Sequence, residues 1–185
     1  MTTADPEDRA LVARALAGDQ SAYGGLMRRH RDAVYRLARG HMGDANEALD
    51  ITQESFIAAF AALSSYDKER PFQVWLARIA LNKCRDWARR RTVRRFFTTA
   101  RPMDEALHVR DTAKTPEESV GLKQDLARTG AAIASLQASL KDALLLCAVE
   151  GMSHADAAAV LQITPKAIET RLYRARVKLA EILRD

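Results

Sequence analysis

Along most of the chain, apolar residues recur every three or four positions, which is the spacing of one face of an α-helix. One such stretch carries Leu26, Val34 and Leu37. After a break, the next stretch carries Leu49, Phe56, Phe60 and Leu63 on one stripe. No segment shows the alternation of period two that is typical of a β-strand. The pattern therefore predicts an all-α fold.

Capping residues mark the ends of these helices. Asp5-Pro6 is typical of a helix start, Gly18 ends that helix, and Ser21 is expected to cap the next. Gly43-Asp44 separates the second helix from the third, and Ser153 opens a short helix near the C-terminus. The expected helices cover about residues 6–17, 22–42, 45–63, 72–91, 136–150, 154–161 and 165–183.

The helical periodicity is lost between Thr92 and Lys114, where charges of both signs are mixed. A capping box with proline at the first helical position, Thr115-Pro116-Glu117-Glu118, then opens a new helical segment. We therefore expect two small helical domains, residues 1–92 and 115–185, joined by a flexible linker over 93–114. Such a linker leaves the relative position of the two domains open.

Positive charge is concentrated in one part of the chain. The 185 residues carry a net charge of +5 and a pI of about 9.5. Residues 78–101 alone hold nine basic side chains against one acid, Asp86. A solvated helix face is one explanation of such a run. A concentrated basic stripe is also the electrostatic signature of a polyanionic partner.

The last fifty residues predict a helix-turn-helix. A short helix from His154 to Leu161 is followed by a turn at Gln162-Ile163, and Thr164-Pro165 opens a longer basic helix. In DNA-binding proteins, the second helix of this motif enters the major groove. A helical hairpin that never touches DNA is the alternative. Two basic elements joined by one linker favour the DNA-binding interpretation, because once one element has bound DNA, the contact made by the other becomes intramolecular.

The aromatic residues around the basic helix have two possible roles. Phe72, Trp75 and Trp87 fall on its apolar side and are expected in the core. Tyr66 instead lies in a polar loop directly before the helix. It is either an ordinary surface tyrosine or a platform on which an unpaired base could stack.

Several classes of function find no support in the sequence. Cys84 and Cys147 lie far apart and the four histidines lack metal-ligand spacing, so we expect no metal and no cofactor. No pattern of nucleophile, base or phosphate loop predicts an enzyme. The acidic N-terminus does not resemble a secretory signal, and no apolar run approaches the length of a membrane span. The expected location is the cytoplasm.

Three segments together resemble the sigma-70 family of RNA polymerase sigma factors, specifically its extracytoplasmic-function (ECF) group. Residues 44–56 resemble the acidic helix that grips the polymerase clamp helices, and residues 72–86 resemble the minus-ten recognition helix. Residues 150–158 and 170–176 resemble the minus-thirty-five helix-turn-helix. The resemblance implies sigma domain 2 over 1–92 and sigma domain 4 over 115–185.

The resemblance also implies roles for particular residues. Core polymerase would be bound by Glu47, Asp50, Gln53 and Glu54. The minus-ten element would be bound by Ser65, Tyr66, Arg78, Asn82, Arg85, Arg89 and Arg90, with a flipped base held by the loop from Ser64 to Arg70. The minus-thirty-five element would be bound by Lys166, Glu169, Thr170, Arg171, Arg174 and Arg176.

The implied function is that of an alternative sigma factor. It would bind the clamp helices and the flap of core RNA polymerase and direct transcription initiation at stress-response promoters. The expected partners are core polymerase, promoter DNA and an anti-sigma factor, which could hold the protein at the membrane if it is itself membrane-bound. No small-molecule substrate is expected. Heavy-metal, oxidative, envelope and general stress all stay open as signals. The competing interpretation is a two-domain helix-turn-helix regulator that binds duplex DNA without polymerase.

Overall fold

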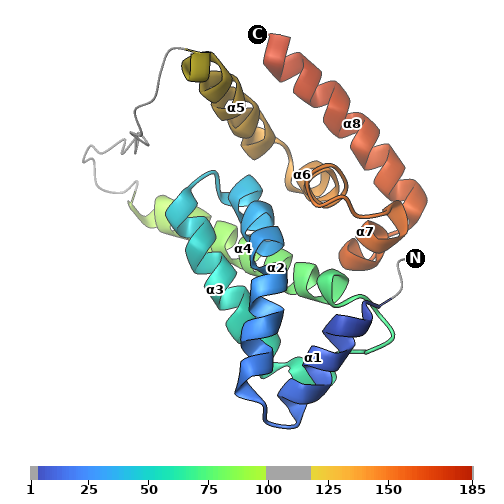
Figure 1. Cartoon of the computed structure of the whole chain (residues 1–185). Coiled ribbons are helices and arrows are strands. Elements are labelled where there is room, and N and C mark those ends of the chain that lie inside the picture. The colour runs from blue at the N-terminus through green and yellow to red at the C-terminus, as the bar shows by residue number, and fades with distance from the viewer. Residues whose placement is uncertain (1–3, 99–117, 185) are drawn as a thin grey trace.

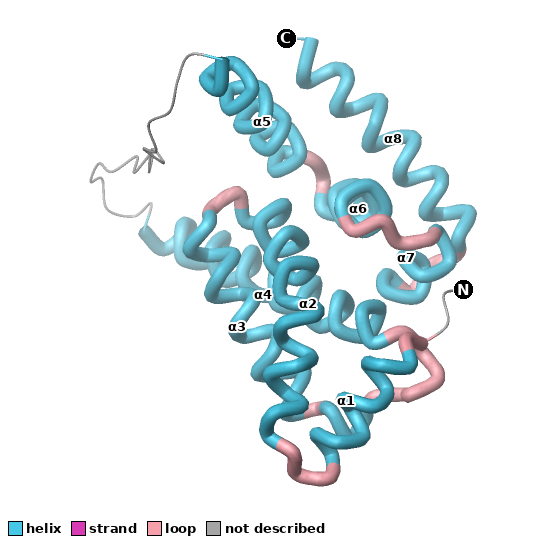
Figure 2. Tube along the Cα trace, in the orientation of Figure 1, coloured by secondary structure: helices cyan, strands magenta, loops and turns pink. Residues whose placement is uncertain are grey.

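The computed structural model describes residues 4–98 and 118–184, and every regular element within these ranges is helical (Figures 1 and 2). The N-terminal domain consists of α1 (Pro6–Leu16), α2 (Gln20–Met42), α3 (Ala45–Ala61), a 3₁₀ turn (Leu63–Ser65) and α4 (Phe72–Thr98). The C-terminal domain consists of α5 (Glu118–Ser135), α6 (Ala138–Leu144), a π turn (Leu145–Val149), α7 (His154–Leu161) and α8 (Pro165–Arg184).

Most helix starts follow the capping residues in the sequence. The side chains of Asp5, Asp44 and Ser153 each accept a backbone N–H from the first turn of the helix that follows. The start of α2 differs from the prediction. Asp19, not Ser21, is the cap, and its carboxylate accepts hydrogen bonds from both the backbone N–H and the hydroxyl of Ser21. A carboxylate two residues before Ser21 reaches that N–H directly, so α2 begins at Gln20, two residues earlier than expected.

Two helix boundaries depart further from the sequence pattern. α4 continues to Thr98, so it runs past the predicted start of the linker at residue 93, while residues 99–117 lie outside the described residues. The predicted single helix over 136–150 is in fact α6 followed by a π turn, in which the Glu150 N–H donates to the Leu145 carbonyl at 3.0 Å. Gly151 then ends the segment with φ +65°.

The core of the N-terminal domain lies between α2, α3 and α4, and it contains Leu26, Phe56 and Phe72, each nearly inaccessible to solvent. Leu49 was expected in this core but is 38 % exposed, because the buried face of α3 turns through Ala48 and Ile51 instead. Gly25 has a steric role where α1 crosses α2. A Cβ there would lie 2.8 Å from Leu11 Cδ2, so glycine permits the close approach.

A buried acid fastens α1 to α2. The Asp8 side chain is 5 % exposed and lies 2.9 Å from Arg29 Nε. Both Asp8 oxygens lie 3.0 Å from Nε2 of His30, whose ring packs on Phe72. Burial by itself would raise the pKa of Asp8, but the hydrogen bonds and charges of His30 and Arg29 outweigh it and hold that pKa below its usual value.

Asp8→Asn should lower the free energy of unfolding at pH 7 by about 1–3 kcal/mol, because it leaves buried His30 and neighbouring Arg29 without a charged acceptor. A carboxyl group whose pKa is depressed stabilises the fold above its unfolded pKa of about 3.9, and this contribution disappears as the pH falls through the folded pKa. Urea unfolding across pH should therefore show a difference between wild type and variant that is constant near neutrality and shrinks below about pH 4. The same substitution at exposed Asp32 serves as the control. A difference that persists unchanged in acid would contradict this role of Asp8.

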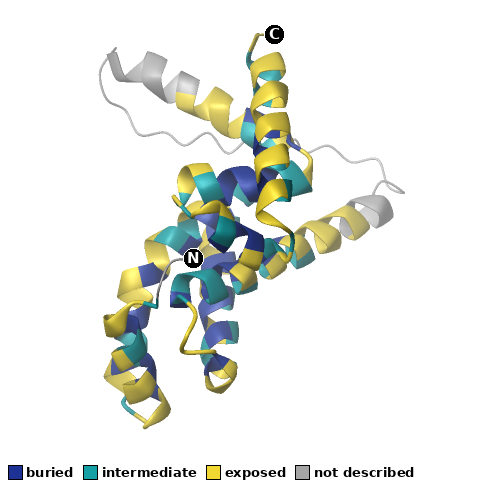
Figure 3. Ribbon diagram, turned by 90° about the vertical axis from the view of Figure 1, so that its right-hand side faces the viewer, coloured by how far each residue is buried: buried dark blue, intermediate teal, exposed yellow. Residues whose placement is uncertain are grey.

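The two domains pack against each other. α7 lies against α4, and α5 and the π turn lie against α2 (Figure 1). Buried Leu145 and Leu146 of the C-terminal domain join the same apolar cluster as Leu37, Leu76 and Leu81 of the N-terminal domain. Figure 3 shows buried residues running through this junction, while much of α8 projects from it exposed. Packing of the described helices thus defines a domain arrangement that the linker sequence left open.

Candidate nucleic-acid interface

The outer side of α3 carries the first candidate surface. Asp50, Gln53 and Ile57 are spaced three and four residues apart, so they share one helix face, and all three are exposed. Ile57 is 69 % exposed, which is unusual for a large apolar side chain in a helical domain. We call these three residues the α3 face. Sequence reasoning missed Ile57, although its position seven residues after Asp50 places it on this face and not on that of Phe56.

The other two predicted polymerase contacts are engaged within the protein. Glu54 lies 3.6 Å from Lys83 Nζ and 3.9 Å from Arg90 Nη2, and Glu47 lies 3.6 Å from Arg91 Nη1. Burial raises the pKa of Glu47, with Asp44 and Asp50 adding to the increase and Arg91 opposing it. Glu47 and Glu54 therefore help to hold the basic helix α4 against α3, while Asp50 and Gln53 face solvent.

The second candidate surface lies on α4. Arg78, Asn82, Arg85 and Arg89 are spaced four, three and four residues apart and are all exposed, so they form one stripe along the helix. We call this stripe the α4 face. Arg90 lies beside it, toward Glu54. Guanidinium groups at this spacing can follow a nucleic-acid backbone, and Asn82 can pair with a base edge.

Two arginines of the α4 face already have acidic partners. Arg89 pairs with Asp86 one turn earlier, and Arg85 Nη2 lies 2.6 Å from Oδ2 of Asp142 in the C-terminal domain. Arg78 has no ion-pair partner among the described side chains. The Arg85 contact is the unexpected one, because it joins residues 57 positions apart across the domain boundary.

Tyr66 lies in the core and not on the surface, which corrects the interpretation of its ring as an exposed stacking platform. Only 6 % of the residue is exposed, and its ring lies 5.3 Å from that of Phe72 and 5.2 Å from that of Trp75. Its hydroxyl donates to the Arg70 carbonyl, and burial raises its pKa to about 12. Tyr66 therefore shapes the loop from within. Ser65 is exposed at the loop's edge, and its hydroxyl donates to the Ala62 carbonyl.

The third candidate surface is the helix-turn-helix of α7 and α8. Gln162 adopts a left-handed backbone with φ 56° between the helices, and the Thr164 hydroxyl accepts the Ala167 N–H at 3.2 Å. One face of α8, with Ile168, Leu172 and Ala175, is buried against the domain. The opposite face presents the predicted DNA contacts Lys166, Glu169, Thr170 and Arg174, all exposed.

Two further arginines flank this exposed face of α8. Arg171 is half-buried and Arg176 is exposed. At 3.6 residues per turn they lie about 140° apart around the helix, so they border the exposed face from opposite sides. If the guanidinium group of one of them approaches a base edge, that of the other is left to contact the DNA backbone or solvent. Lys166 Nζ and Glu169 Oε2 are paired at 2.7 Å, a bond that DNA would have to compete with.

A shallow groove lies beside α8, lined by Leu140, Tyr173, Val177 and neighbouring polar side chains. Tyr173 is 70 % exposed, whereas Leu136 and Leu144, which were expected in the domain core, are buried. Leu140 is only half-buried and lines the groove. An apolar patch of this kind on a small domain is typical of a protein-binding site.

Among the described residues, no group of three His, Cys, Asp or Glu side chains is placed to hold a metal ion. None of the helices in the described ranges is long and apolar enough to cross a membrane.

Comparison with known proteins identifies the family of the chain. The sequence matches Sigma-70 region 2 over residues 26–94 and Sigma-70 region 4 over residues 126–179. It is 39 % identical over 184 residues to the RNA polymerase sigma factor CnrH of Cupriavidus metallidurans, covering 97 % of this chain and 96 % of that protein. It is 31 % identical to the RNA polymerase sigma-H factor of Pseudomonas aeruginosa, covering 96 % and 94 %.

Solved structures give the same result. The structure of CnrH in complex with the cytosolic domain of CnrY matches with a TM-score of 0.72 and 34 % identity, covering 96 % of this chain and 97 % of that one. The sigma factor RpoE of Bartonella quintana, crystallised with the anti-sigma factor NepR, shares the fold with a TM-score of 0.69 at 23 % identity over 88 % of this chain and 96 % of that one. The fold and the two matched sigma-70 regions define a two-domain transcription initiation factor. The chain belongs to the sigma-70 family, in its ECF group.

Proposed function

We propose that this protein binds core RNA polymerase and directs it to a specific set of promoters. The observation that carries the proposal is the separation of three surfaces on one small chain. An acidic and apolar α3 face, a basic α4 face and the exposed face of α8 point away from the core on three different helices. A duplex-binding regulator has no need of the first two.

The α3 face is the proposed contact with the polymerase clamp. Asp50 and Gln53 offer charge and hydrogen bonding, and Ile57 offers an apolar anchor beside them. Interfaces of this composition place an apolar centre within a polar rim. The groove at Leu140, Tyr173 and Val177 is the proposed contact with the polymerase flap.

The other two surfaces are the proposed promoter contacts. The α4 face and the nearby loop from Ser64 to Arg70, with exposed Ser65, would bind the minus-ten element and capture a flipped base. Tyr66 would support this loop from the core. α8 would enter the major groove at the minus-thirty-five element. Residues 4–98 then serve as sigma domain 2 and residues 118–184 as sigma domain 4.

Control by an anti-sigma factor is part of the proposal. The likeness to CnrH, whose structure includes the cytosolic domain of CnrY, supports a protein partner of this kind. The protein would act in the cytoplasm, where polymerase is found, and a membrane-bound anti-sigma factor would hold it at the membrane.

In vitro transcription from pooled genomic promoter fragments tests this function. Core polymerase with the protein should give promoter-specific transcripts that core polymerase alone does not give. Duplex binding without any new initiation would instead favour a helix-turn-helix regulator that acts without polymerase.

Arg171→Ala should weaken binding to such a promoter by about 1–3 kcal/mol if its guanidinium reads a base. Arg176→Ala, on the opposite flank of α8, is the matched variant. Competition binding with single-base promoter variants should show that only one of the two substitutions relaxes the base preference, and that it does so at one promoter position. An equal loss on all sequences for Arg171→Ala would assign that residue to a phosphate instead.

A further inference from the structure

Two acids of the C-terminal domain are buried against arginines of the N-terminal domain. The Asp142 side chain is 3 % exposed and lies 2.6 Å from Nη2 of Arg85. The Glu150 side chain is 2 % exposed and accepts hydrogen bonds from Nε and Nη2 of Arg36 at 3.1 and 2.9 Å. Removing a carboxylate from water in this way is unfavourable unless it is paired, so both acids are specifically matched to the closed domain arrangement.

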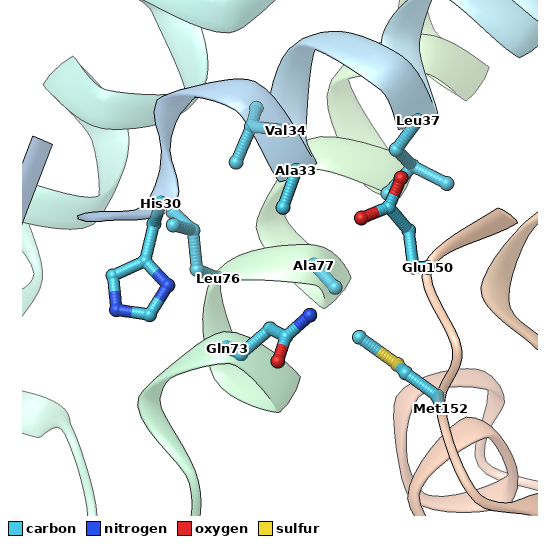
Figure 4. Close-up of a pocket in the computed structure, with 9 residues that line it drawn as sticks. All are labelled: His30, Ala33, Val34, Leu37, Gln73, Leu76, Ala77, Glu150 and Met152. Atoms are coloured by element: carbon cyan, nitrogen blue, oxygen red, sulfur yellow. The ribbon is translucent and has the colours of Figure 1, made fainter. Parts of the chain in front are cut away.

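The helices at this junction also fit closely. A Cβ at Gly40 of α2 would lie 2.5 Å from Cδ2 of Leu145, which is 1 % exposed. A small pocket also lies at the domain boundary, lined by Glu150 and Met152 from one domain and by residues such as Leu37 and Leu76 from the other (Figure 4). A side chain at position 40 would therefore force Leu145 to shift from its place at the domain boundary.

The closed arrangement is incompatible with binding both promoter elements. The minus-ten and minus-thirty-five elements are about 25 base pairs apart, or about 85 Å along B-DNA. A compact chain of this length has a radius of gyration of about 16 Å and therefore spans only about 40 Å. The domains must separate before α4 and α8 can contact both elements.

Arg85 has an anionic partner in both the closed and the open state. In the closed state it binds the Asp142 carboxylate, and in the proposed open state it contacts promoter DNA. We infer that Asp142 and Glu150 form an intramolecular latch, in which Asp142 takes the place of a DNA phosphate at Arg85 and keeps the unbound protein inactive. This inference rests on the proposed promoter role of the α4 face.

The latch is suited to opening. Desolvation offsets much of the attraction in a buried ion pair, so such a contact adds specificity more than stability. His41 Nε2 and Asp142 Oδ1 lie 3.3 Å apart but form no hydrogen bond, and burial lowers the pKa of His41 to about 4. Separation of the domains would return both groups to water. Asp50, Gln53 and Arg78 are exposed in the closed state, so polymerase can engage the α3 face before the latch opens.

Two kinds of variant of the full-length protein test the latch. Asp142→Asn with Glu150→Gln removes both carboxylate charges from the junction. Gly40→Gln instead inserts a side chain against Leu145 and leaves every charge in place. Any effect of this variant on DNA binding therefore cannot come from the loss of repulsion between carboxylates and DNA phosphates. Gly24→Gln is the control in the same helix, because a Cβ there meets only the Arg28 side chain, at 3.3 Å. Helix content by circular dichroism checks folding, and Gly40→Ala replaces Gly40→Gln if the larger residue disrupts the fold.

Small-angle X-ray scattering and fluorescence anisotropy with a mixed-sequence single-stranded oligonucleotide give the two measurements. Wild type and Gly24→Gln should scatter as compact particles with a radius of gyration of about 16 Å. The latch variants should scatter as larger particles and bind the oligonucleotide about tenfold or more tightly. An already extended wild type, or open variants with unchanged DNA affinity, would overturn the inference. Neither measurement contains polymerase, so failure of the proposed transcription function is detected separately.

Discussion

Asp50→Lys should abolish binding to core RNA polymerase, with a loss of affinity on the order of 100-fold or more. Asp50 is exposed on the α3 face beside Ile57, and the structure gives it no ion-pair partner among the described side chains. A lysine there would place a positive charge against a partner surface that is complementary to an acid. Biolayer interferometry with immobilised core enzyme measures the effect.

Asp32→Lys is the matched control, since it makes the same charge change at an exposed site on α2. Both variants should stay within about 0.5 kcal/mol of wild type in stability, because neither site is buried. Glu54→Gln should weaken polymerase binding less than Asp50→Lys, because Glu54 already lies near Lys83 and Arg90. Undiminished binding by Asp50→Lys would show that the polymerase contact lies elsewhere.

Phe72→Ala should lower the free energy of unfolding of the N-terminal domain by about 3–5 kcal/mol. Phe72 is fully buried, and the rings of His30, Tyr66 and Trp75 lie 5.1, 5.3 and 5.5 Å from its own. Truncation would leave a cavity where α4 begins and would remove the support of the loop that ends at Arg70. Urea unfolding followed by circular dichroism measures the loss.

Val93→Ala is the control for Phe72→Ala, because Val93 lies on the same helix and is 55 % exposed. We expect it to change stability by less than about 0.5 kcal/mol. A loss below about 1 kcal/mol for Phe72→Ala would mean that the aromatic cluster refills the cavity.

Most of the fold could be predicted from the sequence because its signals are local. Helix starts at Pro6, Ala45 and His154 follow caps one residue away, and the apolar spacing reports the buried face of each helix. The predictions failed where the backbone departs from simple periodicity. The π turn after Leu144 has no sequence signature, and α4 continues past Thr92 because nothing there breaks a helix.

The candidate site was only half predictable. Spacing places Arg78, Asn82 and Arg85 on one face of α4, since three and four residues make one helical turn. Spacing cannot distinguish a free acid from a paired one, and Asp50 and Glu54 look alike in the sequence. Tyr66 likewise sits among polar residues, yet packing against Phe72 and Trp75 buries it.

The sequence by itself determined the helical class, most of the helix starts, the charge of each helix face and the membership of the sigma-70 family, because each depends on neighbours a few positions apart. Only the tertiary structure decided that Arg85 meets Asp142, that Arg36 meets Glu150, and that Gly40 admits Leu145. These pairs lie far apart in the chain. They are brought together by burial of apolar surface between two domains, which acts on area and shape and leaves no periodic trace in the sequence.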